Sequence, residues 1–175
     1  MDENMNIEAL LQFGNQELRK KNIATIMKYV HSKNDEERKN RWKLFTEDCT
    51  SGFTGPEIYN NTDKVRLNPD GREAKAASDA WNHTYFPDYH MENNILFQTQ
   101  DPNYYIVVSQ GNGYIHFPAY GEKKPYENFF FHRFIMRDGL IKDYREHMNF
   151  CQVFHALGVE LPQIRFPGKP ESESL

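Results

Sequence analysis

The order of secondary-structure patterns along the sequence constrains the fold more than any other feature. Helical periodicity dominates up to about residue 86, and strand-like segments follow it. These segments are rich in β-branched and aromatic residues and cover 91–100, 103–111, 113–120, 126–137 and 140–150. Turn residues separate them at 101–103, 111–113, 121 and 138–139. Because connections this short require antiparallel pairing, the second half predicts an antiparallel meander.

Two helices are predicted near the start of the chain. The first lies within 15–32, where an apolar stripe is formed by Leu18, Ile23, Ile26, Met27 and Val30. The second covers 34–49, with Asn34 as a suitable N-cap and acidic residues in its first turn. We expect the two helices to pack on each other.

Two more helices and a hairpin complete the prediction. A hairpin suits the Gly- and Pro-containing stretch 51–56, and an alanine-rich helix is expected over 72–86, ending before Pro87. After the meander, Asn149 can cap a short helix that Gly158 ends.

These elements predict an α+β fold. Helices that precede an antiparallel meander are expected to stack on one face of a curved sheet and to leave a cone-shaped cavity under it. The 175 residues suit a single domain over 1–175. We expect 1–16 to be an N-terminal extension, and 162–175, with its prolines, to be an extended C-terminal arm and tail.

Charge and composition exclude several classes of function. A net charge of −4 and interspersed basic residues argue against nucleic acid or an anionic membrane as a partner. Two cysteines form neither a disulfide framework nor a zinc motif, and the histidines lack metal-ligand spacing, so no metal is expected. There is also no nucleotide-binding or nucleophile-elbow motif. With an acidic amino terminus and no long apolar run, the chain is expected to be cytoplasmic.

Glu146 is the strongest candidate for chemistry. Counting alternately along the last strand from Leu140 places Lys142, Tyr144, Glu146 and Met148 on one face. A carboxyl group between a tyrosine and a methionine loses hydration, which raises its pKa and suits it to proton transfer, and Tyr144 is expected to line the same site. The alternative is a structural glutamate paired with Arg145 or His147.

Three helical residues are weaker candidates. Arg41, next to Trp42, could hold a substrate carboxylate, although solvated helix arginines are common. Ser78 and Asn82 are four residues apart on one helical face and could donate hydrogen bonds into a cavity, although small polar residues also suit a surface helix.

The sequence also resembles a known family. "RWKLFTED", "AWNHTYFPDY", "GNGYIHFPAY", "YENFFFHRF" and "DGLIKDYREHMNFCQVFHALGVELPQI" resemble, in order, the PhzA/PhzB family of phenazine biosynthesis proteins, over about residues 17–167. The resemblance implies a ketosteroid-isomerase-like cone fold and a homodimer. It also implies an enzyme that condenses two molecules of an amino-oxo-cyclohexene carboxylic acid to the tricyclic phenazine precursor, with no metal or redox cofactor.

The resemblance assigns roles to individual residues. Glu146 of "REHMN" matches the family's acid/base carboxyl, Arg41 its carboxylate-binding arginine, and Tyr126 of "YEN" a pocket tyrosine. One departure matters: the family's pocket histidine falls at Ser78 and its nearby serine at Asn82. His83 is the nearest histidine but lies about 140° around the helix from Ser78.

Because a serine cannot take up a proton at neutral pH as imidazole can, either one acid/base group suffices here or another residue substitutes. Two alternatives to the condensing enzyme also remain. One is a catalytically weakened paralogue that acts as a binding or partner subunit. The other is a polyketide-cyclase or isomerase-type enzyme on the same fold, which would use one carboxyl for enolisation.

Overall fold

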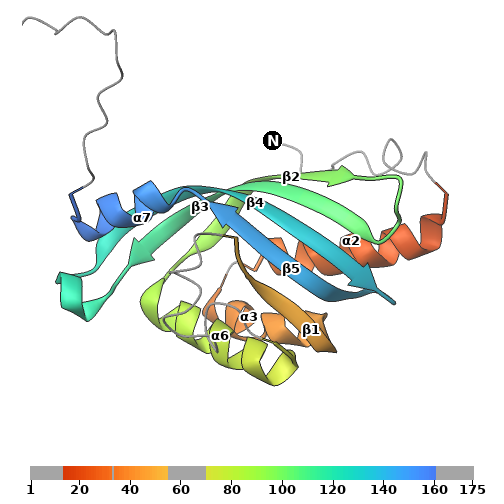
Figure 1. Ribbon diagram of the computed structural model, residues 1–175, viewed down its shortest axis with the longest axis horizontal. Coiled ribbons are helices and arrows are strands. Elements are labelled where there is room, and N and C mark those ends of the chain that lie inside the picture. Colours follow the sequence, from red (N-terminus) through yellow and green to blue (C-terminus); the bar gives the residue numbers. More distant parts are fainter. Residues whose placement is uncertain (1–13, 33, 55–69, 161–175) are drawn as a thin grey trace, which may run out of the picture.

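The computed structural model describes residues 14–32, 34–54 and 70–160 (Figure 1). Its described strands form one sheet in the order β1-β5-β4-β3-β2. They are β1 (Phe45–Phe53), β2 (His90–Gln98), β3 (Tyr104–Ile115), β4 (Lys124–Arg137) and β5 (Leu140–Met148). Strands β2 to β5 pair in antiparallel fashion, as the short connections predict, whereas β1 runs parallel to β5. The α+β prediction is confirmed, with a mixed sheet in place of a purely antiparallel one.

The helices lie where the sequence places them, with one exception. They are α2 (Gln16–Val30), α3 (Asp35–Lys39), α6 (Arg72–Tyr85) and α7 (Phe150–Leu157), together with the 3-10 turns η1 (Arg41–Leu44) and η2 (Pro118–Tyr120). Asn34 accepts a hydrogen bond from the Glu37 backbone N–H, and Asn149 caps α7 by accepting one from Cys151. In Figure 1, α2, α3 and α6 lie on one side of the sheet, and α7 packs against β4. No described helix has the length and apolarity needed to cross a membrane.

The exception is the helix predicted over 34–49, which ends at Lys39. The chain continues through η1 into β1, where Phe45 and Cys49 are fully buried. Parallel pairing is possible here because a long connection, which includes α6 and three strands, separates β1 from β5. The hairpin predicted over 51–56 is wrong for 51–53, which end β1, and from residue 55 it lies outside the described residues.

The turn predicted at 111–113 is also wrong, because β3 continues straight through it. A side chain at Gly111 would collide with the ring of Tyr89 and with Phe130, and one at Gly113 would collide with the Tyr89 backbone. These glycines therefore give Tyr89 room to lie against the strand. The segment predicted as a strand over 113–120 instead divides between the end of β3 and η2.

The core consists of two clusters on the helix-covered side of the sheet. One joins α2 to the middle of the sheet and includes Ile26, Phe45, Phe134 and Tyr144. The other joins the end of α6 and α7 to the far end of the sheet, around the buried side chains of Tyr89, Ile115, Tyr126 and Phe130. Of the two predicted terminal segments, 1–13 and 162–175 lie outside the described residues.

Candidate active site

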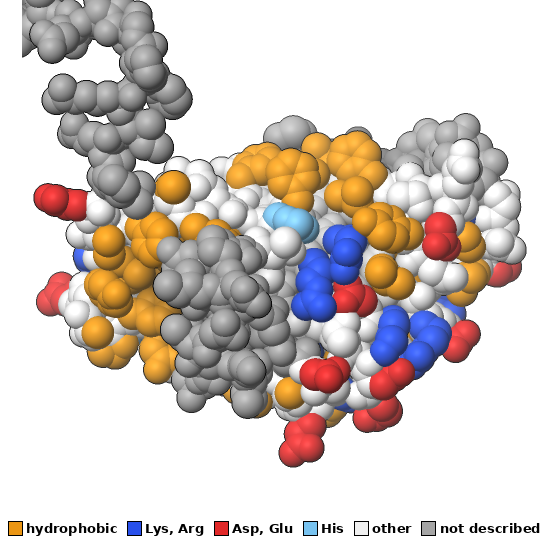
Figure 2. Space-filling model, in the orientation of Figure 1, with side chains coloured by type: hydrophobic (Ala, Val, Ile, Leu, Met, Phe, Trp, Pro, Cys, Tyr) orange, Lys and Arg blue, Asp and Glu red, His pale blue; other side chains and the backbone are white. Residues whose placement is uncertain are grey.

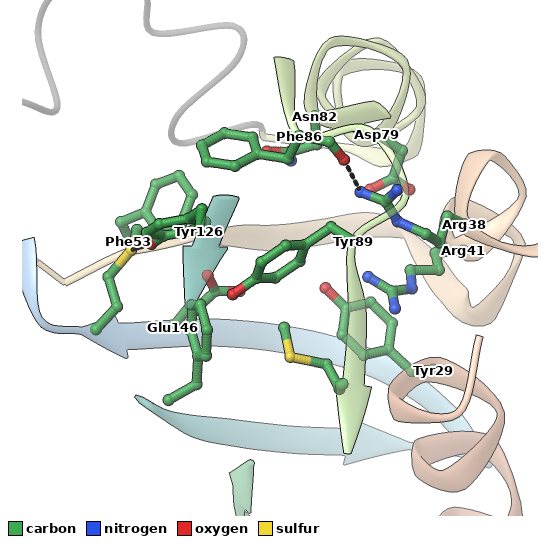
Figure 3. Close-up of a pocket in the computed structure, with 13 residues that line it drawn as sticks. Tyr29, Arg38, Arg41, Phe53, Asp79, Asn82, Phe86, Tyr89, Tyr126 and Glu146 are labelled. Atoms are coloured by element: carbon green, nitrogen blue, oxygen red, sulfur yellow. Dashed lines mark hydrogen bonds between the residues drawn. The ribbon is translucent and has the colours of Figure 1, made fainter. Parts of the chain in front are cut away.

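A cavity of about 70 Å³ lies between the two core clusters (Figure 3). Its walls come from α2, α3, η1, α6 and the sheet. The lining residues are Tyr29, Arg38, Arg41, Phe53, Asp79, Asn82, Phe86, Tyr89, Met91, Tyr126, Phe130, Glu146 and Met148. Figure 3 draws Arg38, Arg41 and Asp79 on one side of the cavity and Glu146 on the other.

Glu146 is a largely buried carboxyl at this cavity, with a side chain 15% exposed. The Tyr144 hydroxyl donates a 2.6 Å hydrogen bond to its Oε2 atom. Burial raises the pKa of Glu146, and the Tyr144 hydrogen bond and the Arg41 and Lys75 charges oppose that rise only in part. The two partners expected for a structural glutamate do not pair with Glu146, because Arg145 pairs with Asp143 at 3.3 Å and His147 contacts Thr54 at 3.3 Å.

The register of β5 differs from simple alternation. Met136 pairs with Ile141 and Ile135 with Asp143, so one residue of β5 bulges at Lys142. As a result, Ile141 and Tyr144 both point into the core, and Lys142 instead binds the backbone of Asp48. The predicted face is therefore wrong at its start and correct from Tyr144 to Met148.

A buried histidine, His132, is linked to the Glu146 carboxyl through Tyr144. The ring of His132 is fully buried, and its Nδ1 atom lies 2.7 Å from the Tyr144 oxygen. Burial lowers the pKa of His132 to about 3, so the ring is neutral at physiological pH. When Tyr144 donates to an ionised Glu146, Nδ1–H of His132 must donate to Tyr144. His132, Tyr144 and Glu146 thus form one hydrogen-bonded chain.

Two arginines face the cavity, and the sequence indicated one of them. Arg41 donates to the Ser32 hydroxyl at 3.1 Å, and its guanidinium lies 4.7 Å from the Tyr29 ring centroid, so its aromatic neighbour is Tyr29 and not Trp42. No described carboxylate forms an ion pair with Arg41. Arg38 donates to the Phe86 carbonyl at 2.8 Å, and burial, aided by Arg41, lowers its pKa to about 10.

Helix α6 contributes Asn82 and Asp79 to the lining. Ser78, on the same helix, is buried but is not among the lining residues. His83 is no substitute for it, because its Nδ1 atom lies 3.3 Å from Asp35 and the ring does not line the cavity. Lys75 and Asp79, one turn apart, form a buried ion pair.

Tyr126 is brought to the cavity by β4. Its hydroxyl accepts a 2.6 Å hydrogen bond from the Asn128 side chain, which fixes the ring. Burial raises the pKa of Tyr126, so it stays protonated at physiological pH. Of the residues expected at the site, Arg41, Asn82, Tyr126 and Glu146 therefore meet at the cavity. Tyr144 does not line the cavity but donates a hydrogen bond to Glu146, and Ser78 does not line the cavity.

Sequence reasoning missed Arg38, Asp79 and Tyr89 as lining residues. Arg38 precedes Arg41 by three positions and Asp79 follows Lys75 by four, and such spacings place residues on one helical face. Tyr89 carried no such signal, because its position depends on the glycines of β3. Among the described residues, no group of three His, Cys, Asp or Glu side chains could hold a metal ion.

Comparison with known proteins identifies the family. The model of the phenazine biosynthesis protein A/B family matches residues 2–171. The chain belongs to this family. It is 40% identical to phenazine biosynthesis protein PhzB1 of Pseudomonas aeruginosa over 158 residues, which cover 88% of this chain and 91% of that protein. It is 36% identical to PhzA of Pseudomonas fluorescens over 156 residues, or 89% of this chain and 91% of that one.

Solved structures of this family and of others share the fold. The crystal structure of a phenazine biosynthesis-related protein from Pseudomonas aeruginosa superposes with a TM-score of 0.76 at 38% identity, covering 88% of this chain and 96% of that one. A candidate polyketide cyclase from Xanthomonas campestris has a TM-score of 0.65 at 14% identity, covering 80% of this chain and 98% of that one. The second likeness supports the cone-shaped fold alone.

The raised pKa of Glu146 predicts a pH-dependent cost in stability. Above the ordinary pKa of a glutamate the unfolded chain has lost this proton while the native protein keeps it, so stability falls as the pH rises through that interval. Glu146→Gln removes the fall. The variant should therefore gain stability relative to the wild type as the pH rises above 4.5, the ordinary pKa of a glutamate, and each 1 kcal/mol raises Tm by about 2–4 °C.

Thermal unfolding at a series of pH values measures this effect. Glu73→Gln, which changes an exposed glutamate on α6, is the matched control and should show no such trend. If the difference in Tm between Glu146→Gln and the wild type does not grow with pH, the burial assigned to the Glu146 carboxyl is contradicted.

Proposed function

We propose that the protein is an enzyme of phenazine biosynthesis that condenses two molecules of an amino-oxo-cyclohexene carboxylic acid through imine formation. The family and the shared fold support the pathway. The main observation in favour of this reaction is that Glu146 and Arg41 line the same cavity. Glu146 is a buried carboxyl with a raised pKa, and Arg41 has no carboxylate partner among the described residues.

The chemistry needs a group that both gives and takes a proton. In each half-reaction an amine nitrogen attacks a ketone carbon to give a carbinolamine, which loses water to form a C=N bond. Glu146 in its protonated form donates the proton with which the hydroxyl leaves as water, and its carboxylate takes the proton released from nitrogen. Two such condensations release two water molecules and join the two rings.

The other residues bind and orient. Arg41 holds a substrate carboxylate, which positions the reacting atoms near Glu146. Asn82 and Tyr126 offer hydrogen bonds from the wall, and Tyr144, linked to His132, fixes the Glu146 carboxyl. Ser78 is assigned no contact with the substrate, because it lies outside the lining.

Substrate entry requires the cavity to widen. A volume of about 70 Å³ holds a few water molecules, whereas pockets for small molecules usually measure about 300–1,000 Å³. Met91 and Met148 line the cavity and are the side chains best able to move, because methionine is unbranched and flexible. We therefore expect binding to displace them.

The homodimer implied by the resemblance is part of the proposal. On the outer face of the sheet, β2 exposes Ile95 and Phe97, and β4 exposes Phe129 and Phe131, each more than 50% accessible. Figure 2 shows hydrophobic side chains gathered over the sheet. A face of this kind is typical of a protein interface, and we assign it to a second copy of the chain.

The first test is turnover. Purified protein should accelerate formation of the tricyclic product from the amino-ketone precursor. Glu146→Gln should lower kcat by about 10²-fold or more, since general acid/base groups contribute about 10²–10⁴-fold. Arg41→Met should mainly raise KM. Glu73→Gln, at an exposed position of α6, should behave as the wild type. Equal rates with and without protein would contradict the proposal and favour a binding or partner subunit.

The second test is assembly. Sedimentation equilibrium should give twice the chain mass for the wild type, and Phe131→Glu should give the monomer mass, because a charge cannot be buried unpaired at the interface. Tyr120→Glu changes an aromatic of similar exposure on η2 and should leave the dimer intact. A wild-type monomer, or a Phe131→Glu dimer of unchanged stability, would remove this surface from the account.

A further inference from the structure

Helix α6 carries a buried ion pair that the proposed reaction leaves unused. Lys75 and Asp79 are one helical turn apart, and their side chains are only 4% and 5% exposed. The Lys75 ammonium also lies 5.0 Å from the centroid of the Phe45 ring. Burying two charges costs free energy, and apolar residues of similar size are often as stable or more so in such a place. Stability alone therefore does not account for the pair.

Asp79 is also part of the cavity wall. One carboxylate oxygen, Oδ1, pairs with Lys75, and the backbone N–H of Trp42 also lies near enough to the carboxyl to lower its pKa. The other oxygen, Oδ2, is buried and accepts no hydrogen bond of ordinary length and angle from the described residues. Polar atoms at such depth are nearly always satisfied, so an unpaired carboxylate oxygen beside a cavity indicates a partner that comes from a ligand. A carboxylate only accepts hydrogen bonds, so that partner must donate.

The charges around Asp79 define what the donor can be. Burial raises the pKa of Asp79, and the positive charges of Lys75 and Arg41 oppose that rise only in part. Arg41 has no carboxylate partner of its own among the described residues, whereas Arg38 has Asp35 at 3.5 Å. Among the described residues, the cavity wall near α6 thus offers a guanidinium without a carboxylate partner, that of Arg41, and a carboxylate with one unpaired oxygen, that of Asp79. A ligand that carries a carboxylate and an amino group complements both.

We propose that Asp79 accepts a hydrogen bond from the amino group of the ligand whose carboxylate Arg41 holds, so that the cavity selects amino acids over plain carboxylic acids. The placement of the carboxylate rests on the proposed function. Lys75 is the positioning residue, which keeps Oδ1 occupied and leaves Oδ2 for the ligand. Glu146, on the opposite side of the cavity, remains the group that exchanges protons.

Calorimetric titration with two probes tests the selectivity without turnover. The probes are 2-aminocyclohexanecarboxylate and cyclohexanecarboxylate, which differ by the amino group alone. The wild type should bind the amino acid at least about 10-fold more tightly, since hydrogen bonds to charged groups are strong. In Asp79→Asn the ratio of the two affinities should fall to about one, without loss of affinity for cyclohexanecarboxylate.

Three further variants separate selectivity from folding and from charge. Lys75→Met/Asp79→Leu replaces the whole pair with apolar side chains, so it should fold and should also lose the preference. Glu73→Gln removes an exposed carboxylate from the same helix and should keep the wild-type ratio. Arg41→Met should weaken both probes to a similar extent.

Equal affinities for the two probes in the wild type, no binding of either probe, or a preference that survives in both Asp79 variants would overturn the proposal. The outcome is separable from that of the proposed function. Condensation without a preference for the amino acid probe would contradict this inference alone. A preference that depends on Asp79, without turnover, would contradict the proposed reaction alone.

Discussion

The burial of the Glu146 carboxyl is the constraint on which the site depends. An ionised carboxylate among aromatic rings loses its hydration, and the hydrogen bond from Tyr144 and the nearby positive charges compensate for that loss only in part. The group therefore holds its proton more tightly than a glutamate in water. A raised pKa suits a carboxyl to act both as an acid and as a base, which the proposed imine formation requires.

The environment of Glu146 arises because the core consists of two clusters with the cavity between them. One cluster under α2 fixes Tyr144 and the buried His132 behind Glu146, and the other places Tyr89, Tyr126 and Phe130 around the remaining space. The bulge at Lys142 turns Tyr144 inward. The glycines of β3 admit Tyr89. Except for Tyr126, the polar groups proposed to bind the ligand come from the helical side, so they face the proposed acid/base group across the cavity.

Much of this arrangement could be predicted from the sequence, and the failures have physical causes. Periodicity and caps gave the helices, and short turns gave the antiparallel strands. The β1 strand was missed because its parallel partner is distant in the chain, and local pattern carries no information on such pairing. Gly111 indicates a turn by composition, yet here it relieves a collision with Tyr89. Glu146, Arg41, Asn82 and Tyr126 were predicted and line the cavity, whereas Asp79 was missed although its spacing from Lys75 places the two on one helical face.

The pKa of Glu146 is the most direct test of the account. Carbon-13 NMR of the side-chain carboxyl, assigned by the signal that Glu146→Gln loses, follows its protonation across the pH range. The account predicts a midpoint clearly above 4.5, the ordinary value for a glutamate. A midpoint at or below that value would mean that the protein does not disfavour the ionised carboxylate, and the proposed proton transfer would have no source.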